Sequence, residues 1–262
     1  MKKTTTILTA CSLALCASSA MADNAATIFG YASGTAVTYD GDGTFPVVTT
    51  ILSVPGVTVN GKTYSATSGS FLAADPSGSL QIFGTPASTY TPTVGDAIAV
   101  NGTYSPYHQL PEIGSVTQVA VSGTLESPPI VQPQVVTVSQ TDVPTLPQSI
   151  AGQLLQIDNA TISGETVSTF GIANLTLTVT DSTGSQTLYY WPTSYSMANL
   201  NLYGQTIPTG PVDIIGIASV YTSGSSPEEF LPINIIPAPE PSSIALAAIG
   251  GVAVLMGLRR RK

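Results

Sequence analysis

The exported part of this sequence is predicted to contain no cysteine, and that absence limits its chemistry. The chain has two cysteines, Cys11 and Cys16, and both lie within the first 22 residues. Those residues have the order of a secretory signal peptide: a positive start, an apolar stretch over residues 7–17, and small residues at Ala20 and Ala22 around a cleavage site. A lipoprotein box ending at Cys11 is the alternative, but too few apolar residues precede it. Export through the Sec machinery and cleavage by signal peptidase after Ala22 would leave a chain without disulfides or thiol chemistry.

Positive charge is almost as scarce. Two of the seven basic residues lie in the signal peptide and four end the chain. Residues 23–241 therefore contain one basic residue, Lys62, and all fifteen acidic residues, which gives them a net charge of −14 (fifteen negative, one positive). Nucleic-acid binding depends on several Lys and Arg side chains to neutralise phosphates, so we expect no nucleic-acid partner. Few charges, an acidic balance and many Thr, Ser, Val and Gly residues are typical of an extracellular β protein.

Residues for catalysis or metal binding are also few. His108 is the only histidine, and no Gly-x-Ser-x-Gly motif supplies a nucleophile for it. One histidine without cysteine cannot build a structural zinc site. Asp40 and Asp42, in an Asp-Gly-Asp-Gly run, are the Ca²⁺ candidate, but the third ligand and the distal Glu of an EF-hand loop are missing. The sequence therefore predicts no catalytic residue, no metal site and no cofactor. Glu228 and Glu229 are expected in an exposed loop.

No long helical periodicity is present, and short β-branched runs alternate with Gly, Pro, Asn and Asp clusters. Asn60-Gly61 between two such runs predicts a two-residue hairpin. One short helix is predicted over residues 195–202, with Ser194 as N-cap. The remaining predicted strands cover residues 97–104, 116–121, 134–138, 154–157, 175–180, 187–190 and 212–220. The fold class is all-β.

Two segments repeat weakly, which predicts a duplicated unit. Asp75-Pro-Ser-Gly78 matches Asp181-Ser-Thr-Gly184, each after a strand-like run. The other matches, in the same order, are Pro86 with Pro192, Gly102 with Gly216, and Leu110-Pro111 with Leu231-Pro232. The predicted organisation is a signal peptide (1–22), a first β module (23–128), a Pro-rich linker (129–134), a second β module (135–237) and a C-terminal tail (238–262).

The order of strands and turns in each copy resembles the OB-like β-barrel modules that occur in tandem in some secreted bacterial proteins. Asp75 and Gly78 with Asp181 and Gly184 carry this resemblance, together with mid-strand glycines that permit a sharp bend. A pair of immunoglobulin-like sandwiches uses the same periodicity and remains the alternative.

The C-terminal tail has three parts. Pro239-Glu240-Pro241 is followed by residues 244–258, which carry no charge, and then by four cations, Arg259, Arg260, Arg261 and Lys262. With the two preceding serines, the apolar segment covers about 25 Å as a helix, close to a hydrocarbon core of about 30 Å. The cations would stay on the cytoplasmic side, so we expect an inner-membrane helix with the rest of the chain outside.

This tail resembles the PEP-CTERM sorting signal of Gram-negative bacteria. The resemblance implies recognition by an exosortase, a membrane enzyme that processes the tail near Pro239–Pro241, and then release or transfer to the cell surface. It also implies a cell envelope rich in exopolysaccharide. Tyr189 and Trp191, on one face of a predicted strand, are candidate carbohydrate contacts.

The function expected is that of an exported surface or matrix protein without catalytic activity, associated with exopolysaccharide or biofilm. The alternatives are a carbohydrate-binding module and a polysaccharide hydrolase that uses two carboxylates about 5–10 Å apart in one cleft.

Overall fold

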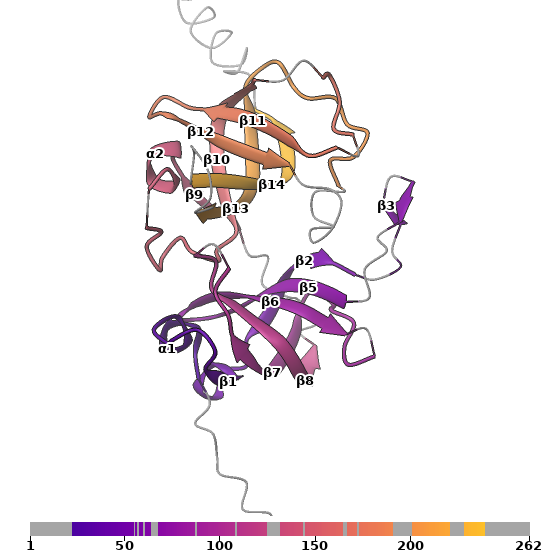
Figure 1. The fold of residues 1–262 in the computed structure, drawn as a ribbon, viewed down its shortest axis with the longest axis vertical. Coiled ribbons are helices and arrows are strands. Elements are labelled where there is room, and N and C mark those ends of the chain that lie inside the picture. Colours follow the sequence, from indigo (N-terminus) through magenta and orange to yellow (C-terminus); the bar gives the residue numbers. More distant parts are fainter. Residues whose placement is uncertain are drawn as a thin grey trace, which may run out of the picture.

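The computed structural model describes residues 23–54, 56, 58–59, 61–63, 68–86, 88–107, 109–124, 132–143, 145–164, 167–171, 173–190, 201–220 and 228–238. Their regular structure is almost entirely β-strand, in two six-stranded sheets and one small hairpin (Figure 1). The all-β prediction is confirmed. The hairpin pairs β3 (Thr58–Val59) with β4 (Lys62–Thr63), as the sequence predicts on either side of Asn60-Gly61.

The first sheet, indigo to magenta in Figure 1, has a closed order of pairing. Its strands are β1 (Ala36–Tyr39), β2 (Val47–Ser53), β5 (Ser68–Asp75), β6 (Gly78–Pro86), β7 (Asp96–Tyr104) and β8 (Glu112–Thr124). The order is β1-β7-β2-β5-β6-β8, and β8 also pairs with β7, so five strands follow one another in a ring. The β6–β8 contact is parallel and the other strand pairs are antiparallel. Helix α1 (Ala25–Phe29) precedes β1, and the 3-10 turn η1 (Gly41–Gly43) follows it.

The second sheet follows the same plan. Its strands are β9 (Gln134–Val136), β10 (Leu155–Ser163), β11 (Leu175–Thr180), β12 (Ser185–Tyr190), β13 (Val212–Val220) and β14 (Glu228–Pro237). The order is β11-β12-β14-β13-β10-β9, and β10 also pairs with β11, which again closes a ring of five strands. Here β12 and β14 form the parallel pair within the ring. Helix α2 (Val138–Thr141) lies between β9 and β10 in the chain.

Corresponding strands of the two rings pair in the same register around the parallel contact. In β5 and β6, Phe71 pairs with Ile82, and in β11 and β12, Leu177 pairs with Leu188. The parallel partner of Ile82 is Ile113, and that of Leu188 is Phe230. Ile113 and Phe230 therefore occupy corresponding positions, in strands whose sequences show no obvious match.

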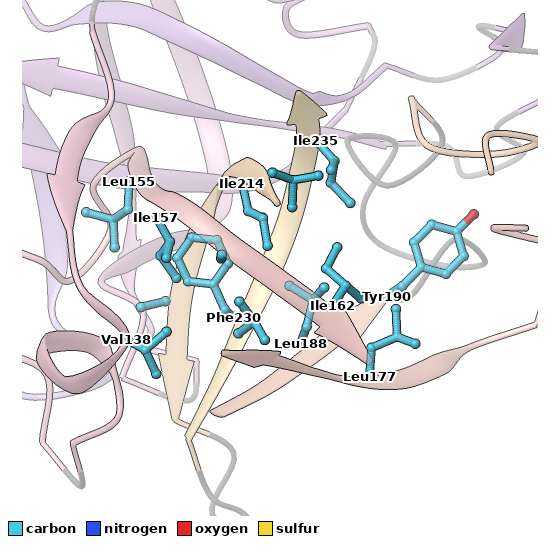
Figure 2. Packing of buried hydrophobic residues seen from close by; sticks show 14 of the residues in the cluster. Val138, Leu155, Ile157, Ile162, Leu177, Leu188, Tyr190, Ile214, Phe230 and Ile235 are labelled. Carbon is cyan, nitrogen blue, oxygen red and sulfur yellow. The ribbon is translucent and has the colours of Figure 1, made fainter. Parts of the chain in front are cut away.

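Alternation of side chains along each strand builds the two cores. In β11 the leucines and valine are buried while the threonines between them point the other way, because successive residues of a strand face opposite sides. Figure 2 shows Leu177, Leu188 and Tyr190 on neighbouring strands of the second ring, with Phe230 beside Ile157 in the same cluster. A separate cluster that includes Phe71, Ile82 and Ile113 fills the first ring.

A third cluster joins the two sheets. Leu52, Leu72 and Leu110 come from the first half of the chain, and Ile217 and Ile233 come from β13 and β14. All five are buried, and Leu154 and Leu231 pack against them. Nearby, the backbone N–H of Leu146 donates to Oε1 of Gln109 at 2.9 Å. The outer faces of the two rings are thus held together by apolar packing.

Several strand predictions need correction. Val138 was expected in a strand but begins α2, because the backbone N–H of Thr137 donates to Gln140 Oε1 and closes a capping box. Gln134 is the first residue of β9, as the predicted strand over 134–138 has it, although the predicted linker (129–134) also includes it. Leu231-Pro232 lies inside β14 at a register shift opposite Gly216, whereas Leu110-Pro111 precedes β8, so the proposed match of these two pairs is wrong. Pro192 and almost all of the predicted helix over 195–202 lie outside the described residues.

Candidate functional site

The C-terminal tail leaves the second sheet directly from its last strand. β14 ends at Pro237, which pairs with Val212, and the backbone N–H of Ala238 donates to Pro211 O at 3.1 Å. The expected sorting residues 239–241 and 259–262 lie outside the described residues, as does the apolar segment 244–258. Among the residues that are described, no helix is long and apolar enough to cross a membrane. The folded body extends to Ala238, the residue directly before the Pro-Glu-Pro motif.

The expected start of the exported chain is also part of the fold. Asp23 follows the predicted cleavage site, and its backbone N–H donates to Thr38 O at 2.9 Å. Its carbonyl oxygen accepts hydrogen bonds from the backbone of Asp40 and Gly41. Its carboxylate accepts one from the Tyr31 hydroxyl at 2.8 Å. Ala20 and Ala22 lie outside the described residues.

The Ca²⁺ candidate is a hydrogen-bonded turn. Asp42 N–H donates to Asp40 Oδ1, and Asp42 Oδ2 accepts from the Asn24 side chain at 2.6 Å. The backbone of Asp42 is left-handed, with φ at 55°, which Asp tolerates better than most residues. Within the described part of the chain, no group of three or more His, Cys, Asp or Glu side chains is arranged to hold a metal ion.

Of the aromatic candidates, Tyr189 is described and Trp191 is not. Tyr189 is half-buried on β12, opposite Thr176, and its hydroxyl accepts a hydrogen bond from Asn174 Nδ2 at 3.4 Å. Tyr190 points the other way into the core, where its ring lies 4.9 Å from that of Phe170. Tyr189 thus belongs to the outer face of β11 and β12, as the alternation predicts. His108 lies outside the described residues.

The matched turn residues Asp75 and Asp181 do more than set turns. Oδ1 of Asp181 accepts from the backbone of Thr183 and Gly184, and its Oδ2 accepts from Val138 N at 2.9 Å, the first residue of α2. Oδ1 of Asp75 makes the same bonds to the backbone of its own turn, and its Oδ2 accepts from Ala25 N at 2.8 Å, the first residue of α1. Each carboxylate fastens a distant one-turn helix to its hairpin.

The next residue of each helix repeats the pattern. Ser77 Oγ accepts from Ala26 N at 3.0 Å, and Thr183 Oγ1 accepts from Ser139 N at 3.1 Å. Burial acts to raise the pKa of Asp181, but hydrogen bonds from Thr183, Val138 and Gly184 outweigh it and hold that pKa below its usual value.

The sequence analysis predicts neither the burial of Glu112 nor the partial burial of Glu229. Glu112 on β8 and Glu229 on β14 occupy corresponding positions in the parallel strand pair of each ring, opposite Gln81 and Thr187. Burial raises the pKa of each to about 7. Glu112 is 7% exposed and accepts a hydrogen bond from Gln81 Nε2 at 3.2 Å. Glu228 and Glu229 were expected in an exposed loop, but both lie in β14. No local pattern around either residue indicates burial, because the strands that cover them are distant in sequence.

One cavity of about 280 Å³ opens beside the segment that contacts the tail. It is bounded by β10 and β11 and by two loops that pair with each other, since Ile207 N–H donates to Ser168 O at 2.9 Å. Its walls are largely apolar and carry no charged side chain. The lining residues are Ile162, Ser163, Val167, Ser168, Leu177, Thr206, Ile207, Pro208 and Thr209.

A comparison with protein families matches residues 237–262 to the PEP-CTERM protein-sorting motif. The chain carries a PEP-CTERM sorting signal. The matched region begins at the last residue of β14 and contains the Pro-Glu-Pro and basic residues expected from the sequence. The PEP-CTERM signal implies an exosortase as processing partner and an exported protein that is sorted to the cell surface.

No curated protein matches the chain. Among solved structures, similar chains come from "Structural mimicry for functional antagonism" (12% identity, TM-score 0.39, covering 78% of this chain and 95% of that one) and from "Structure of murine DNA binding protein bound with ds DNA" (12%, 0.38, 74% and 99%). Another comes from "Molecular basis for abrogation of activation of pro-inflammatory cytokines" (12%, 0.37, 76% and 89%). At these TM-scores the likenesses carry no argument about function.

Proposed function

We propose that this PEP-CTERM protein is an exported, non-catalytic surface or matrix protein that is anchored in the inner membrane for a time by its tail. A cleaved signal peptide would deliver the body, and an exosortase would then process the tail and release or transfer the body to the cell surface. The observation that carries the proposal is the sorting motif at residues 237–262, which follows the folded body directly.

The body is proposed to be two OB-like barrels that arose by duplication. Three features support this: the closed ring of five strands in each sheet, the parallel contact at the same place in each ring, and the matched carboxylates of Asp75 and Asp181. The closed pairing disfavours the immunoglobulin-like alternative, in which two separate sheets face each other.

The absence of catalysis is also a proposal. The carboxylates of Asp75 and Asp181 already accept backbone hydrogen bonds in their turns. Glu112 is almost fully buried and hydrogen-bonded to Gln81, which removes it from any substrate. These positions do not favour a hydrolase that needs two carboxylates facing one cleft.

The test of sorting uses the full chain in cells that contain an exosortase. Pro239, Glu240 and Pro241 are changed to alanine, and the mass and location of the product are compared with those of the unchanged chain. The unchanged chain should lose its tail and leave the membrane fraction, while the variant should stay whole in that fraction. A control chain with Pro128, Pro129 and Pro133 changed to alanine should behave as the unchanged one. Identical products from the motif variant and the unchanged chain would refute the proposal.

A second candidate function is binding of a neutral polysaccharide on the outer face of β11 and β12. The hydroxyl groups of Thr180 and Ser185 lie 2.8 Å apart on this face, and Tyr189 offers a ring that Asn174 steadies. The remaining outward-facing residues of the two strands are threonines: Thr176, Thr178 and Thr187. Side chains of this kind suit sugar hydroxyls, and the net charge of −14 disfavours an acidic polysaccharide.

Binding to an immobilised neutral exopolysaccharide tests this candidate. Tyr189→Ala should weaken binding by about tenfold, equivalent to ~1.4 kcal/mol, while Tyr189→Phe keeps the ring and should bind nearly as well. Equal binding by the alanine and phenylalanine variants would show that the ring makes no contact with the sugar.

A further inference from the structure

The shortness of the connection between the body and the tail restricts where the body lies during sorting. Ala238 is still hydrogen-bonded to Pro211, and the apolar segment begins at Ile244. Fully extended, a chain covers at most about 3.3–3.6 Å per residue, so Pro237 lies within about 25 Å of the first residue of that segment. The headgroup region on each side of a bilayer takes up several ångströms of this length. The end of the second ring near Pro237 is therefore next to the membrane as long as the tail is anchored.

That end of the ring is the part of the surface that suits such a position. We define the rim as Val167, Ile207, Pro208, Pro211 and Pro237. Val167 is 45% exposed, Pro211 and Pro237 are exposed, and Ile207 and Pro208 are partly exposed. Val167, Ile207 and Pro208 also line the cavity. The rim thus combines apolar side chains with a hollow of about 280 Å³.

The rim differs from the rest of the body in its charge. Residues 205–212 and 230–238 contain no charged side chain, although the exported part carries a net charge of −14. Three acidic residues flank these segments or Val167 in sequence. Asp213 accepts a hydrogen bond from the backbone of Asn159, Glu229 is partly buried, and Glu165 lies two residues before Val167. Moving a carboxylate out of water towards an apolar phase costs a large amount of free energy, whereas moving an apolar proline or valine side chain costs little. An acidic protein that must lie against a lipid surface needs one end with few charges, and the five rim residues beside the tail carry none.

We infer that the rim is a membrane-contact surface, which rests on the lipid interface before the tail is processed and so holds Pro239–Pro241 at a fixed depth for the exosortase. This inference rests on the proposed function and adds to it the surface that positions the motif. The occupant is the lipid interface itself, because the tethered end of the body can reach no other phase that an uncharged, apolar surface would favour.

The test places negative charge on the rim of the full chain and follows processing in cells that contain an exosortase. In the rim variant, Val167→Glu and Pro211→Glu add two charges at exposed positions. The matched control, Val121→Glu with Val135→Glu, adds the same two charges at exposed valines away from the rim, which are 50% and 60% exposed. Processing of the rim variant should be at least about fivefold slower than that of the control, as measured by loss of tail mass in a pulse-chase experiment. Equal rates would overturn the inference.

Further arms separate the explanations. A flexible six-residue spacer between Ala238 and Pro239 should restore processing of the rim variant, because the charged rim can then stay away from the lipid. If the spacer does not restore it, the rim contacts the exosortase rather than the membrane, and the inference is wrong. Equal melting temperatures of the processed rim and control products exclude a folding defect. If the Pro239–Pro241 alanine variant is processed normally, the proposed function fails, independently of the rim.

Discussion

Glu112 and Glu229 make the stability of this protein depend on pH near neutrality. Burial raises the pKa of each to about 7. In the unfolded chain a glutamate ionises near pH 4.3. Between these values the unfolded chain releases protons that the folded chain keeps, so the free energy of unfolding falls as pH rises. Above about pH 7 both states are ionised and the loss is complete.

Replacing Glu112 by glutamine should reduce this dependence. The amide has the shape of the protonated carboxyl, carries no charge to bury, and can still accept a hydrogen bond from Gln81. We expect Glu112→Gln to raise the free energy of unfolding by about 1–3 kcal/mol at pH 8 and to change it little at pH 4.5. Urea unfolding at both pH values measures the difference.

The control for Glu112 is an exposed carboxylate in the second half of the chain. Asp142→Asn, at the end of α2, should leave the difference between pH 4.5 and pH 8 as it is in the unchanged protein. A Glu112→Gln protein with the pH dependence of the unchanged chain would show that Glu112 ionises normally in the folded state.

At the scale of elements, each one-turn helix depends on a hairpin far away in sequence. A helix as short as α2 is not stable alone, because nucleating a helix costs more free energy than the hydrogen bonds of a single turn provide. Asp181 supplies the acceptor for its first N–H group and for two N–H groups of its own turn. We therefore expect α2 and the turn at Asp181 to form together, rather than α2 to form by itself.

Removing this carboxylate should weaken the second ring. Asp181→Ala is expected to lower the free energy of unfolding at pH 7 by about 2–3 kcal/mol, since several charge-assisted hydrogen bonds are lost together. The pKa of Asp181 is lowered in the fold, so its contribution is present above the unfolded pKa and is lost as pH falls through the folded one. Denaturant unfolding at pH 7 and pH 3 should show a smaller difference between Asp181→Ala and the unchanged protein at pH 3.

Ser182→Ala is the matched control because Ser182 is an exposed residue of the same turn. It should change stability by less than about 0.5 kcal/mol. If Asp181→Ala is no less stable than Ser182→Ala at pH 7, the carboxylate does not hold α2 in place.

The elements that the sequence predicts well are those determined by local pattern. The bounds of β11 and β13 agree with the prediction. In β11, apolar residues alternate with threonine up to the turn that begins at Asp181, and β13 is a β-branched run that follows Gly210-Pro211. α2 was missed although Thr137 and Gln140 have the spacing of a capping box, because a single turn shows no helical periodicity and Asp181, which accepts from its first N–H, is distant in sequence. Burial of Glu112 likewise depends on Gln81 from another strand. The sorting motif is legible from the sequence alone, but its contact with Pro211 through Ala238 is not.

At the scale of the molecule, the cluster between the two sheets decides whether they behave as one body. Leu72 faces away from the core of its own ring, since its neighbours Phe71 and Ala73 belong to that core. It is fully buried in the cluster that also includes Ile217 and Ile233 of the second half of the chain. If the two modules were separate, Leu72 would be exposed and about 1.5–3 kcal/mol of hydrophobic stabilisation would be lost. The same holds for Ile217 and Ile233 on the other side of the contact.

The two rings should therefore unfold together, and a polar residue in the shared cluster should separate them. We expect the processed protein to show one calorimetric transition, with equal calorimetric and van't Hoff enthalpies. Leu72→Asn should produce two transitions, because it buries an unsatisfied amide between the sheets while leaving both interior cores intact. Val100→Ala, inside the first ring, should lower the melting temperature by several degrees but keep a single transition, since the contact between the sheets is unchanged. Two transitions in the unchanged protein, or one in Leu72→Asn, would mean that this cluster does not couple the rings.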